Sequence, residues 1–209
     1  MTGSTTGTDC VVVGAGPTGL MTALLLARTG RTVEVLERRP AAEPPPGGVV
    51  LQPATLGLFE QLGALDALTA TGSRITGVDE VVGGAVTYAA DYADLPGVPV
   101  PFALAVPLRA VWGALTDLVG RHAEVRTVFG AEVDGIDQDD AGCVVRTSAG
   151  AHRGRFVVGA TASSPPSGGW PVSRPRSTRC RGASSSRRCR ARPGGRAGCA
   201  ATARSARSS

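Results

Sequence analysis

The sequence contains no lysine, few aromatic residues and no apolar run long enough to cross a membrane. Aromatic residues make up 4% of the chain, and a membrane-spanning helix needs about 20 consecutive apolar residues. The opening Met-Thr-Gly-Ser-Thr has neither the basic nor the apolar segment of a signal peptide. These absences predict a cytoplasmic protein that binds no membrane.

Metal-binding and nucleophilic motifs are also missing. The cysteines form no Cys-x-x-Cys pair and show no zinc spacing, so we expect reduced thiols and no metal site. The two histidines, His122 and His152, stand beside arginines in polar segments, which predicts surface positions. No combination of Ser, His and Asp suggests covalent catalysis, so the sequence predicts no catalytic side chain.

Acidic residues are absent from the last quarter of the chain. All 17 acidic residues and 11 of the 22 arginines precede residue 161, a net charge of −6, and the other 11 arginines follow it. Leu and Ile disappear at the same point, where Arg, Ser, Pro, Ala and Gly take over. This composition predicts a flexible N-terminus over 1–8, an ordered domain over 9–160 and a disordered Arg/Ser/Pro-rich tail over 161–209.

The chain does contain a strand–loop–helix–strand unit. An apolar strand over 10–13 leads into the loop Gly14–Gly19 (Gly-Ala-Gly-Pro-Thr-Gly), and an apolar helix then runs to Gly30. A second strand over 32–36 is followed directly by the acid Glu37. This βαβ pattern is the fingerprint of a dinucleotide-binding site.

Each position of the fingerprint has its own physical role. Gly14 permits the tight turn out of the strand, Gly16 lets the backbone approach a pyrophosphate, and Gly19 allows close packing of helix on sheet. The free N–H groups at the helix start attract phosphate, and Glu37 can accept hydrogen bonds from a ribose. The candidate residues of the loop are Gly14, Ala15, Gly16, Pro17, Thr18 and Gly19.

The rest of the ordered region predicts an α/β fold of the Rossmann-like type with a small antiparallel β insert over about 75–106. Apolar spacing and glycine positions predict the other elements. These are a helical segment over 54–68 punctuated at Gly63, a helix over 109–121, strands over 125–129, 131–137 and 142–147, and a buried parallel strand over 154–160.

In this order, the loop Gly14–Gly19, the segment Leu51–Gly63, the helix start Leu108–Ala110 and the strand Val157–Ala160 resemble a known family. They are similar to the N-terminal half of the flavin-dependent aromatic hydroxylases, the para-hydroxybenzoate hydroxylase-like monooxygenases, and most of all to actinobacterial polyketide hydroxylases. The resemblance covers 9–160. It implies FAD as cofactor, NAD(P)H as reductant, and hydroxylation of a small aromatic or polyketide substrate with O₂.

The resemblance also implies site residues. The glycine-rich loop would hold the FAD pyrophosphate, Glu37 the adenosine ribose, and Arg38 would flank the adenosine. Arg109 would steady the cofactor's phosphates, and the backbone of Val133 would meet the adenine. For Arg109 the alternative is a solvated arginine at a helix start, and for Val133 it is an ordinary core position.

The chain departs from the family's pattern at two places. Gly47 and Gly48 stand where relatives carry an arginine near the flavin. The family strand ends Val-Gly-Ala-Asp-Gly, whereas this chain reads Val158-Gly-Ala-Thr-Ala162. Read one base earlier, the codons of 161–171 permit Asp-Gly-Val-Val-Ala-Ala-Val-Arg-Arg-Val-Ala, which restores the missing Asp-Gly. We therefore hypothesise a frameshift at about Ala160, which makes the tail an out-of-frame readout.

This hypothesis predicts an FAD-binding portion whose monooxygenase activity is impaired as encoded. Two other readings remain open. One is a different FAD-dependent oxidoreductase, halogenase-like or geranylgeranyl reductase-like, built on the same half-domain. The other is a non-enzymatic nucleic-acid binder that uses the arginines of the tail. Aromatic residues interleave little with those arginines, so we expect no specific nucleic-acid partner.

Overall fold

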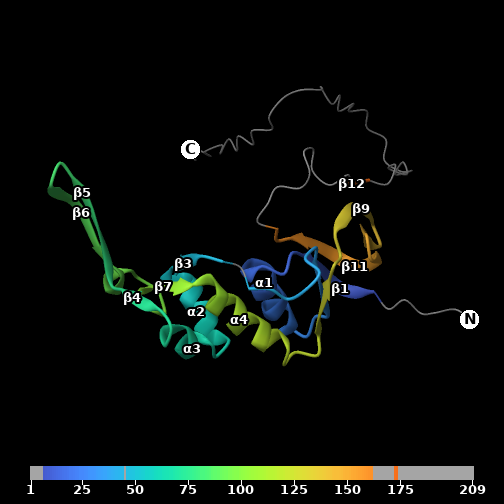
Figure 1. The fold of residues 1–209 in the computed structure, drawn as a ribbon, viewed down its shortest axis with the longest axis horizontal. Coiled ribbons are helices and arrows are strands. Elements are labelled where there is room, and N and C mark those ends of the chain that lie inside the picture. Colours follow the sequence, from blue (N-terminus) through green and yellow to red (C-terminus); the bar gives the residue numbers. More distant parts are fainter. Residues whose placement is uncertain (1–6, 45, 162–171, 174–209) are drawn as a thin grey trace, which may run out of the picture. The chain divides into compact units, whose positions relative to one another are not determined.

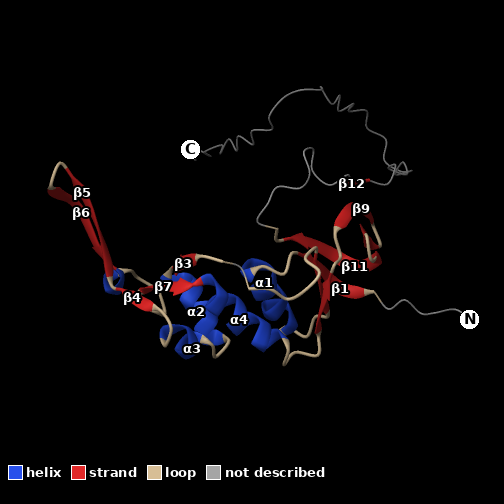
Figure 2. Cartoon of the chain, viewed as in Figure 1, coloured by secondary structure: helices blue, strands red, loops and turns tan. Residues whose placement is uncertain are grey.

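The computed structural model describes residues 7–44, 46–161 and 172–173 (Figure 1). All of them belong to one compact unit, residues 1–175. The expected flexible segment over 1–8 and the expected tail over 161–209 lie almost wholly outside the described residues. Helices and strands of the described part are distinguished in Figure 2.

The helices of the described part are short. They are α1 (Pro17–Ala27), α2 (Pro53–Gln61), α3 (Leu65–Thr69), α4 (Leu108–Val119) and the 3₁₀ turn η1 (Tyr92–Asp94). The predicted helical segment over 54–68 is interrupted at Gly63, whose φ of +69° is left-handed and ends α2 before α3 begins. None of the described helices is long and apolar enough to cross a membrane.

The main sheet combines parallel and antiparallel strands in the order β12-β9-β10-β11-β1-β2-β8. Strands β11, β1, β2 and β8 are parallel, and β9, β10 and β11 form an antiparallel meander. Their bounds are β1 (Thr8–Val13), β2 (Val33–Glu37), β8 (Val125–Phe129), β9 (Val133–Asp139), β10 (Gly142–Thr147), β11 (Gly150–Gly159) and β12 (Val172–Ser173). The predicted α/β fold is therefore confirmed, and the strand over 154–160 is parallel as predicted. The prediction that this strand is buried is wrong, since Phe156 is 64% exposed.

Strand β1 is buried on both faces. Cys10 and Val12 join the core that α1 and α4 cover, whereas Val11 and Val13 join a second core with the meander. Alternation along a strand sends successive side chains to opposite faces. A strand covered on both faces has an uninterrupted apolar sequence, which explains the apolar run at 10–13.

The region after β2 forms two smaller sheets. Strands β3 (Gly48–Leu51), β7 (Ala103–Pro107) and β4 (Ser73–Ile75) make an antiparallel sheet in the order β3-β7-β4. Strands β5 (Gly77–Val82) and β6 (Ala85–Asp91) pair as a separate hairpin. The predicted antiparallel insert is present, and β3, whose pairing with β7 the sequence did not indicate, joins it.

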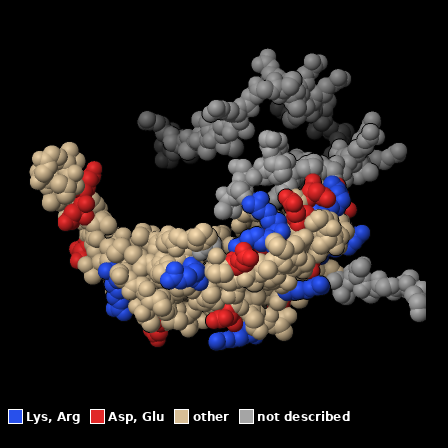
Figure 3. Space-filling view, in the orientation of Figure 1, with Lys and Arg blue, Asp and Glu red and all other residues tan. Residues whose placement is uncertain are grey.

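The β5–β6 hairpin exposes apolar side chains. Val81, Val82, Val86 and Tyr88 are each 59–60% exposed, and the turn end of the hairpin carries no charged side chain in Figure 3. An isolated hairpin is marginally stable in water, and exposed apolar strand edges favour aggregation. We therefore expect this hairpin to be the least stable element of the described fold.

Candidate functional site

The glycine-rich loop joins β1 to α1, and its first and last glycines are required by the protein itself. Gly14 has a φ of +110°, and a Cβ there would lie 2.9 Å from the carbonyl oxygen of Ala160. A Cβ on Gly19 would collide with the carbonyl oxygen of Gly14. Backbone atoms cannot easily move aside, so both positions need glycine for folding alone.

Gly16 differs from these two residues. Its φ of −74° and ψ of 174° are extended backbone that any residue adopts, and a Cβ there would meet nothing within 4 Å. Nothing in the described protein therefore requires glycine at this position. A side chain at position 16 would instead occupy the open space in front of the loop. In the dinucleotide fingerprint, this is the space that the ligand's pyrophosphate takes.

The N-terminus of α1 has the features of an anion-binding site. Gly16 is the N-cap residue, no side chain caps the helix, and its first turn contains no acid. Pro17 stands at the first helical position, where its missing N–H costs nothing. The N–H groups of the first turn, including those of Thr18 and Gly19, have no acceptor within the helix. They give this end of the helix a partial positive charge.

Glu37 is the last residue of β2, contacts the loop and is 7% exposed. Its Oε2 accepts a hydrogen bond from the Ala15 N–H at 2.9 Å. Its Oε1 accepts from the backbone N–H and from the Nε of Arg39, each at 3.1 Å. Burial alone would raise the pKa of this carboxyl, but the Arg39 and Ala15 N–H groups and the Arg39 guanidinium outweigh it and lower the pKa. Glu37 is therefore an ionised acceptor at neutral pH.

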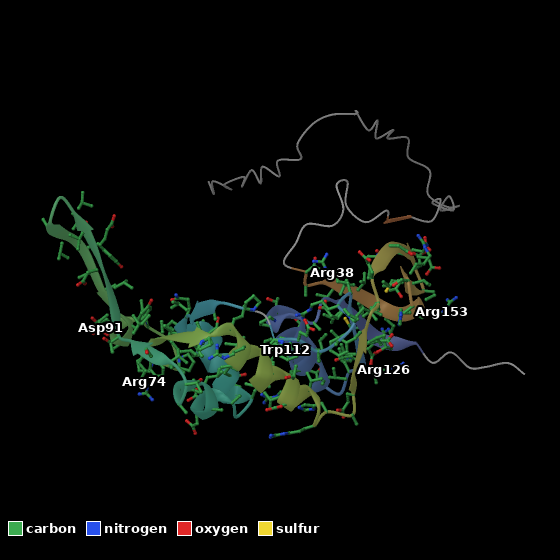
Figure 4. All side chains as sticks on the ribbon, in the orientation of Figure 1. Arg38, Arg74, Asp91, Trp112, Arg126 and Arg153 are labelled. Carbon is green, nitrogen blue, oxygen red and sulfur yellow. The ribbon has the colours of Figure 1, made fainter. Side chains whose placement is uncertain are left out.

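The Ala15 carbonyl has a partner that the sequence did not suggest. The indole Nε1 of Trp112 donates to this oxygen at 3.0 Å, and Figure 4 shows the position of Trp112 on α4. Both residues are buried, Ala15 at 1% and Trp112 at 7% exposure. The apolar pattern of the helix over 109–121 indicated a buried face, but no local signal connects position 112 with a loop 97 residues earlier.

The arginines among the candidate residues are exposed. Arg38 is exposed, and the ion pair with Glu37 is made by Arg39. Arg109 is exposed on the first turn of α4, three residues before Trp112, so both lie on the same side of the helix. No ion pair of Arg38 or Arg109 occurs among the described residues.

Val133 is 8% exposed at the start of β9 and packs in the core between sheet and meander. The chain just before it is held to the end of β2. The Gly130 N–H donates to the Arg39 carbonyl at 2.8 Å, and the Ala131 N–H donates to the Glu37 carbonyl at 2.9 Å. The turn into β9 therefore lies beside the residues that follow β2.

The end of β11 reaches the same loop. The Ala160 N–H donates to the Val13 carbonyl at 2.8 Å, and the Ala160 carbonyl lies against Gly14. A Cβ on Gly14 would also come within 3.3 Å of the Thr161 nitrogen. Ala160, the last residue that matches the family pattern, and Thr161, the first that departs from it, thus lie next to the first glycine of the loop.

The interpretation of His152 as a surface residue is wrong. Its side chain is 13% exposed, and its Nδ1 lies 2.9 Å from Oε2 of Glu34. Arg126 lies 3.7 Å from the other oxygen of Glu34. The error arose because β11 begins in the meander, which covers the sheet face from which Glu34 projects. His152 therefore joins two layers and lies away from the glycine-rich loop.

A separate cavity of about 510 Å³ lies between the start of β1 and the strands β9, β10 and β11. Thr8, Asp139, Cys143 and Arg155 contribute to its lining. The glycine-rich loop follows the opposite end of β1 and does not line it. We assign this cavity no part in the candidate site.

Comparisons with known proteins identify the family of this chain. A family model described as an FAD binding domain matches residues 7–164. The chain is similar to protoasukamycin 4-monooxygenase of Streptomyces nodosus subsp. asukaensis, with 35% identity over 135 residues, 64% of this chain and 33% of that protein. It is also similar to 6-methylpretetramide 4-monooxygenase of Streptomyces rimosus, with 35% identity over 148 residues, 66% of this chain and 33% of that protein. The chain thus spans about a third of the length of these relatives.

Solved structures show the same fold. Against p-nitrophenol 4-monooxygenase PnpA from Pseudomonas putida DLL-E4, the TM-score is 0.63 at 28% identity, over 74% of this chain and 40% of that one. Against the OxyS anhydrotetracycline hydroxylase from Streptomyces rimosus, it is 0.61 at 25% identity, over 73% of this chain and 31% of that one.

Proposed function

The chain belongs to the FAD-binding domain family, and from that premise we propose that the loop Gly14–Gly19 and Glu37 hold the adenosine-diphosphate half of FAD. The observation that carries this proposal is Gly16, a glycine that its own fold does not require. The space a Cβ would fill lies at an uncapped helix start. A diphosphate would fill this space, and the N-terminus of α1 would stabilise its negative charge.

Glu37 retains the capacity to bind a ribose. An ionised carboxylate offers about four lone-pair positions, and its three hydrogen bonds in this fold come from Ala15 and Arg39. We assign the remaining acceptor position to a ribose hydroxyl of the adenosine. The lowered pKa supports this assignment, because the group stays an acceptor across the neutral range.

The exposed arginines complete the proposed site. We assign the Arg109 guanidinium to a phosphate, and the support is that Arg109 shares one side of α4 with Trp112, which contacts the loop. Arg38 follows Glu37 and flanks the adenosine. The backbone at Val133 meets the adenine, since the preceding turn is held beside Glu37 and Arg39.

For the complete protein we propose the hydroxylation of a small aromatic or polyketide substrate in the cytoplasm. Bound FAD, reduced by NAD(P)H, supplies the chemistry that activates O₂. The residues described in this chain bind and orient the cofactor, and we assign none of them a catalytic acid or base role. The support comes from the names of relatives, of which this chain covers about a third.

We further propose that the reading frame changes at about Ala160 and impairs this activity as encoded. Position 161 lies beside Gly14, and the other frame places Asp-Gly at 161–162. Sequencing the locus decides the question. An alternative frame that runs on for hundreds of codons supports the shift, whereas an early stop in that frame overturns it.

The FAD assignment is tested with Gly16→Val, measured by FAD titration and by thermal unfolding. We expect the variant to fold, at a cost of no more than about 1 kcal/mol for a poorer N-cap, and to lose FAD binding. Gly113→Val is the matched control, because a Cβ on Gly113, in α4, also meets nothing within 4 Å. A Gly16→Val protein that binds FAD like the wild type would refute the assignment.

A further inference from the structure

The Ala15 peptide is held from two sides. Glu37, from β2, accepts a hydrogen bond from its N–H at 2.9 Å. Trp112, from α4, donates one to its carbonyl at 3.0 Å. Two elements far apart in the sequence therefore determine the orientation of one residue in the glycine-rich loop.

The Ala15 carbonyl cannot be satisfied by the helix that follows it. The first acceptor of the α1 ladder is the Gly16 carbonyl, which binds the Leu20 N–H at 3.0 Å. The Ala15 carbonyl stands one residue earlier, in a buried position. A buried carbonyl without a donor is costly, and the indole N–H is a donor that also suits an apolar core.

This hydrogen bond also determines where the next N–H points. A peptide group is planar and trans, so its carbonyl and its N–H lie on opposite sides. Since the Ala15 carbonyl faces the indole of Trp112, the Gly16 N–H of the same peptide faces away from it. The Gly16 N–H has no hydrogen-bond partner among the described residues.

We propose that Trp112 is a positioning residue for the phosphate-binding loop, which orients the Ala15–Gly16 peptide so that the Gly16 N–H is presented to a ligand oxygen. The proposal rests on the assignment of this loop to FAD. Trp112 touches the loop and not the cofactor, and its effect on FAD passes through the orientation of this one peptide. Phenylalanine or leucine at position 112 can fill the core but cannot donate the hydrogen bond.

The test compares Trp112→Phe with the wild type in the full chain. We expect the variant to bind FAD about 3- to 10-fold more weakly, the effect of one lost hydrogen bond, and to exchange the Gly16 amide hydrogen faster when FAD is bound. Phe59→Leu is the matched control, because Phe59 is buried in the same core but lies on α2. It should lower the thermal stability and leave the FAD affinity unchanged.

A second measurement needs no substitution at position 112. In a Trp170→Phe background, the only indole N–H of the chain belongs to Trp112, and ¹⁵N labelling makes it visible by NMR. We expect the indole hydrogen of Trp112 to exchange slowly with water and its NMR signal to shift when FAD is added. Rapid exchange, or an indole signal that FAD leaves unmoved, overturns the proposal.

The outcomes separate the two levels of inference. A wild-type chain that binds no FAD overturns both the FAD assignment and the role of Trp112. A wild type that binds FAD while Trp112→Phe binds equally well overturns only the positioning role. Equal weakening by Trp112→Phe and Phe59→Leu also overturns it, since general loosening of the core then explains the loss.

Discussion

Replacing Glu37 with glutamine tests the buried hydrogen bonds that join β2 to the glycine-rich loop. The carboxylate accepts from Ala15 on one oxygen and twice from Arg39 on the other. A glutamine amide has one acceptor oxygen and one NH₂ group. Whichever way the amide turns, its NH₂ group faces another donor, either the N–H of Ala15 or the pair from Arg39.

The expected cost follows from this count. Hydrogen bonds to a charged group contribute about 1.5–3 kcal/mol each, and a buried donor left without a partner costs about 1–3 kcal/mol. We expect Glu37→Gln to lower the free energy of unfolding by about 2–3 kcal/mol. With an m value of about 2 kcal/mol/M, the urea midpoint falls by about 1–1.5 M.

The pH dependence gives a second, independent readout. The pKa of Glu37 in the folded protein lies below its ordinary value of 4.5. A lowered pKa stabilises the fold above the ordinary value, and that stabilisation is lost as the pH falls through the folded value. The difference in unfolding free energy between wild type and Glu37→Gln should therefore be full at neutral pH and shrink below about 4.5.

Urea unfolding of both proteins across this pH range provides the measurement. Glu132→Gln is the control, because it removes the same charge from an exposed side chain and should change stability by less than about 0.5 kcal/mol. Equal midpoints for Glu37→Gln and wild type would refute the reasoning. So would a difference that does not shrink on acidification, since its source could not then be the ionised carboxylate.

Two further predictions concern exposed residues. Arg109→Gln should weaken FAD binding several-fold and reduce the salt dependence of that binding. The change in stability should be below about 0.5 kcal/mol, because the side chain is exposed. FAD titrations at two salt concentrations provide the measurement, and an unchanged affinity contradicts the prediction. The side chain of Val82 is 59% exposed. Val82→Lys should reduce aggregation, measured by light scattering, because a charged lysine disfavours pairing of an exposed apolar strand with another chain. The urea midpoint should change little.

Much of the fold could be predicted because its signals are local. The apolar run at 10–13, the three glycines of the loop and the acid at position 37 follow one another within a single βαβ unit. Apolar spacing and glycine positions also predicted the strands that form β9 and β10, and a parallel strand where β11 lies. The burial of Leu20, Ala23 and Leu24 on α1 follows from their helical spacing.

Contacts between distant segments could not be predicted in this way. The pairing of His152 with Glu34 spans 118 residues and depends on the meander covering one face of the sheet. A polar sequence context therefore suggested exposure where the layers produce burial.

The sequence by itself determined the dinucleotide fingerprint, its position between strand and helix, and the change of composition after residue 160, since these depend on residue types close together in the chain. The fingerprint assigned the pyrophosphate to Gly16, but only the tertiary structure showed what distinguishes this glycine from the other two. Gly14 and Gly19 are confined by backbone atoms, whereas Gly16 faces open space. It also decided that Trp112 holds the Ala15 carbonyl, because that contact exists only when α4 packs against α1.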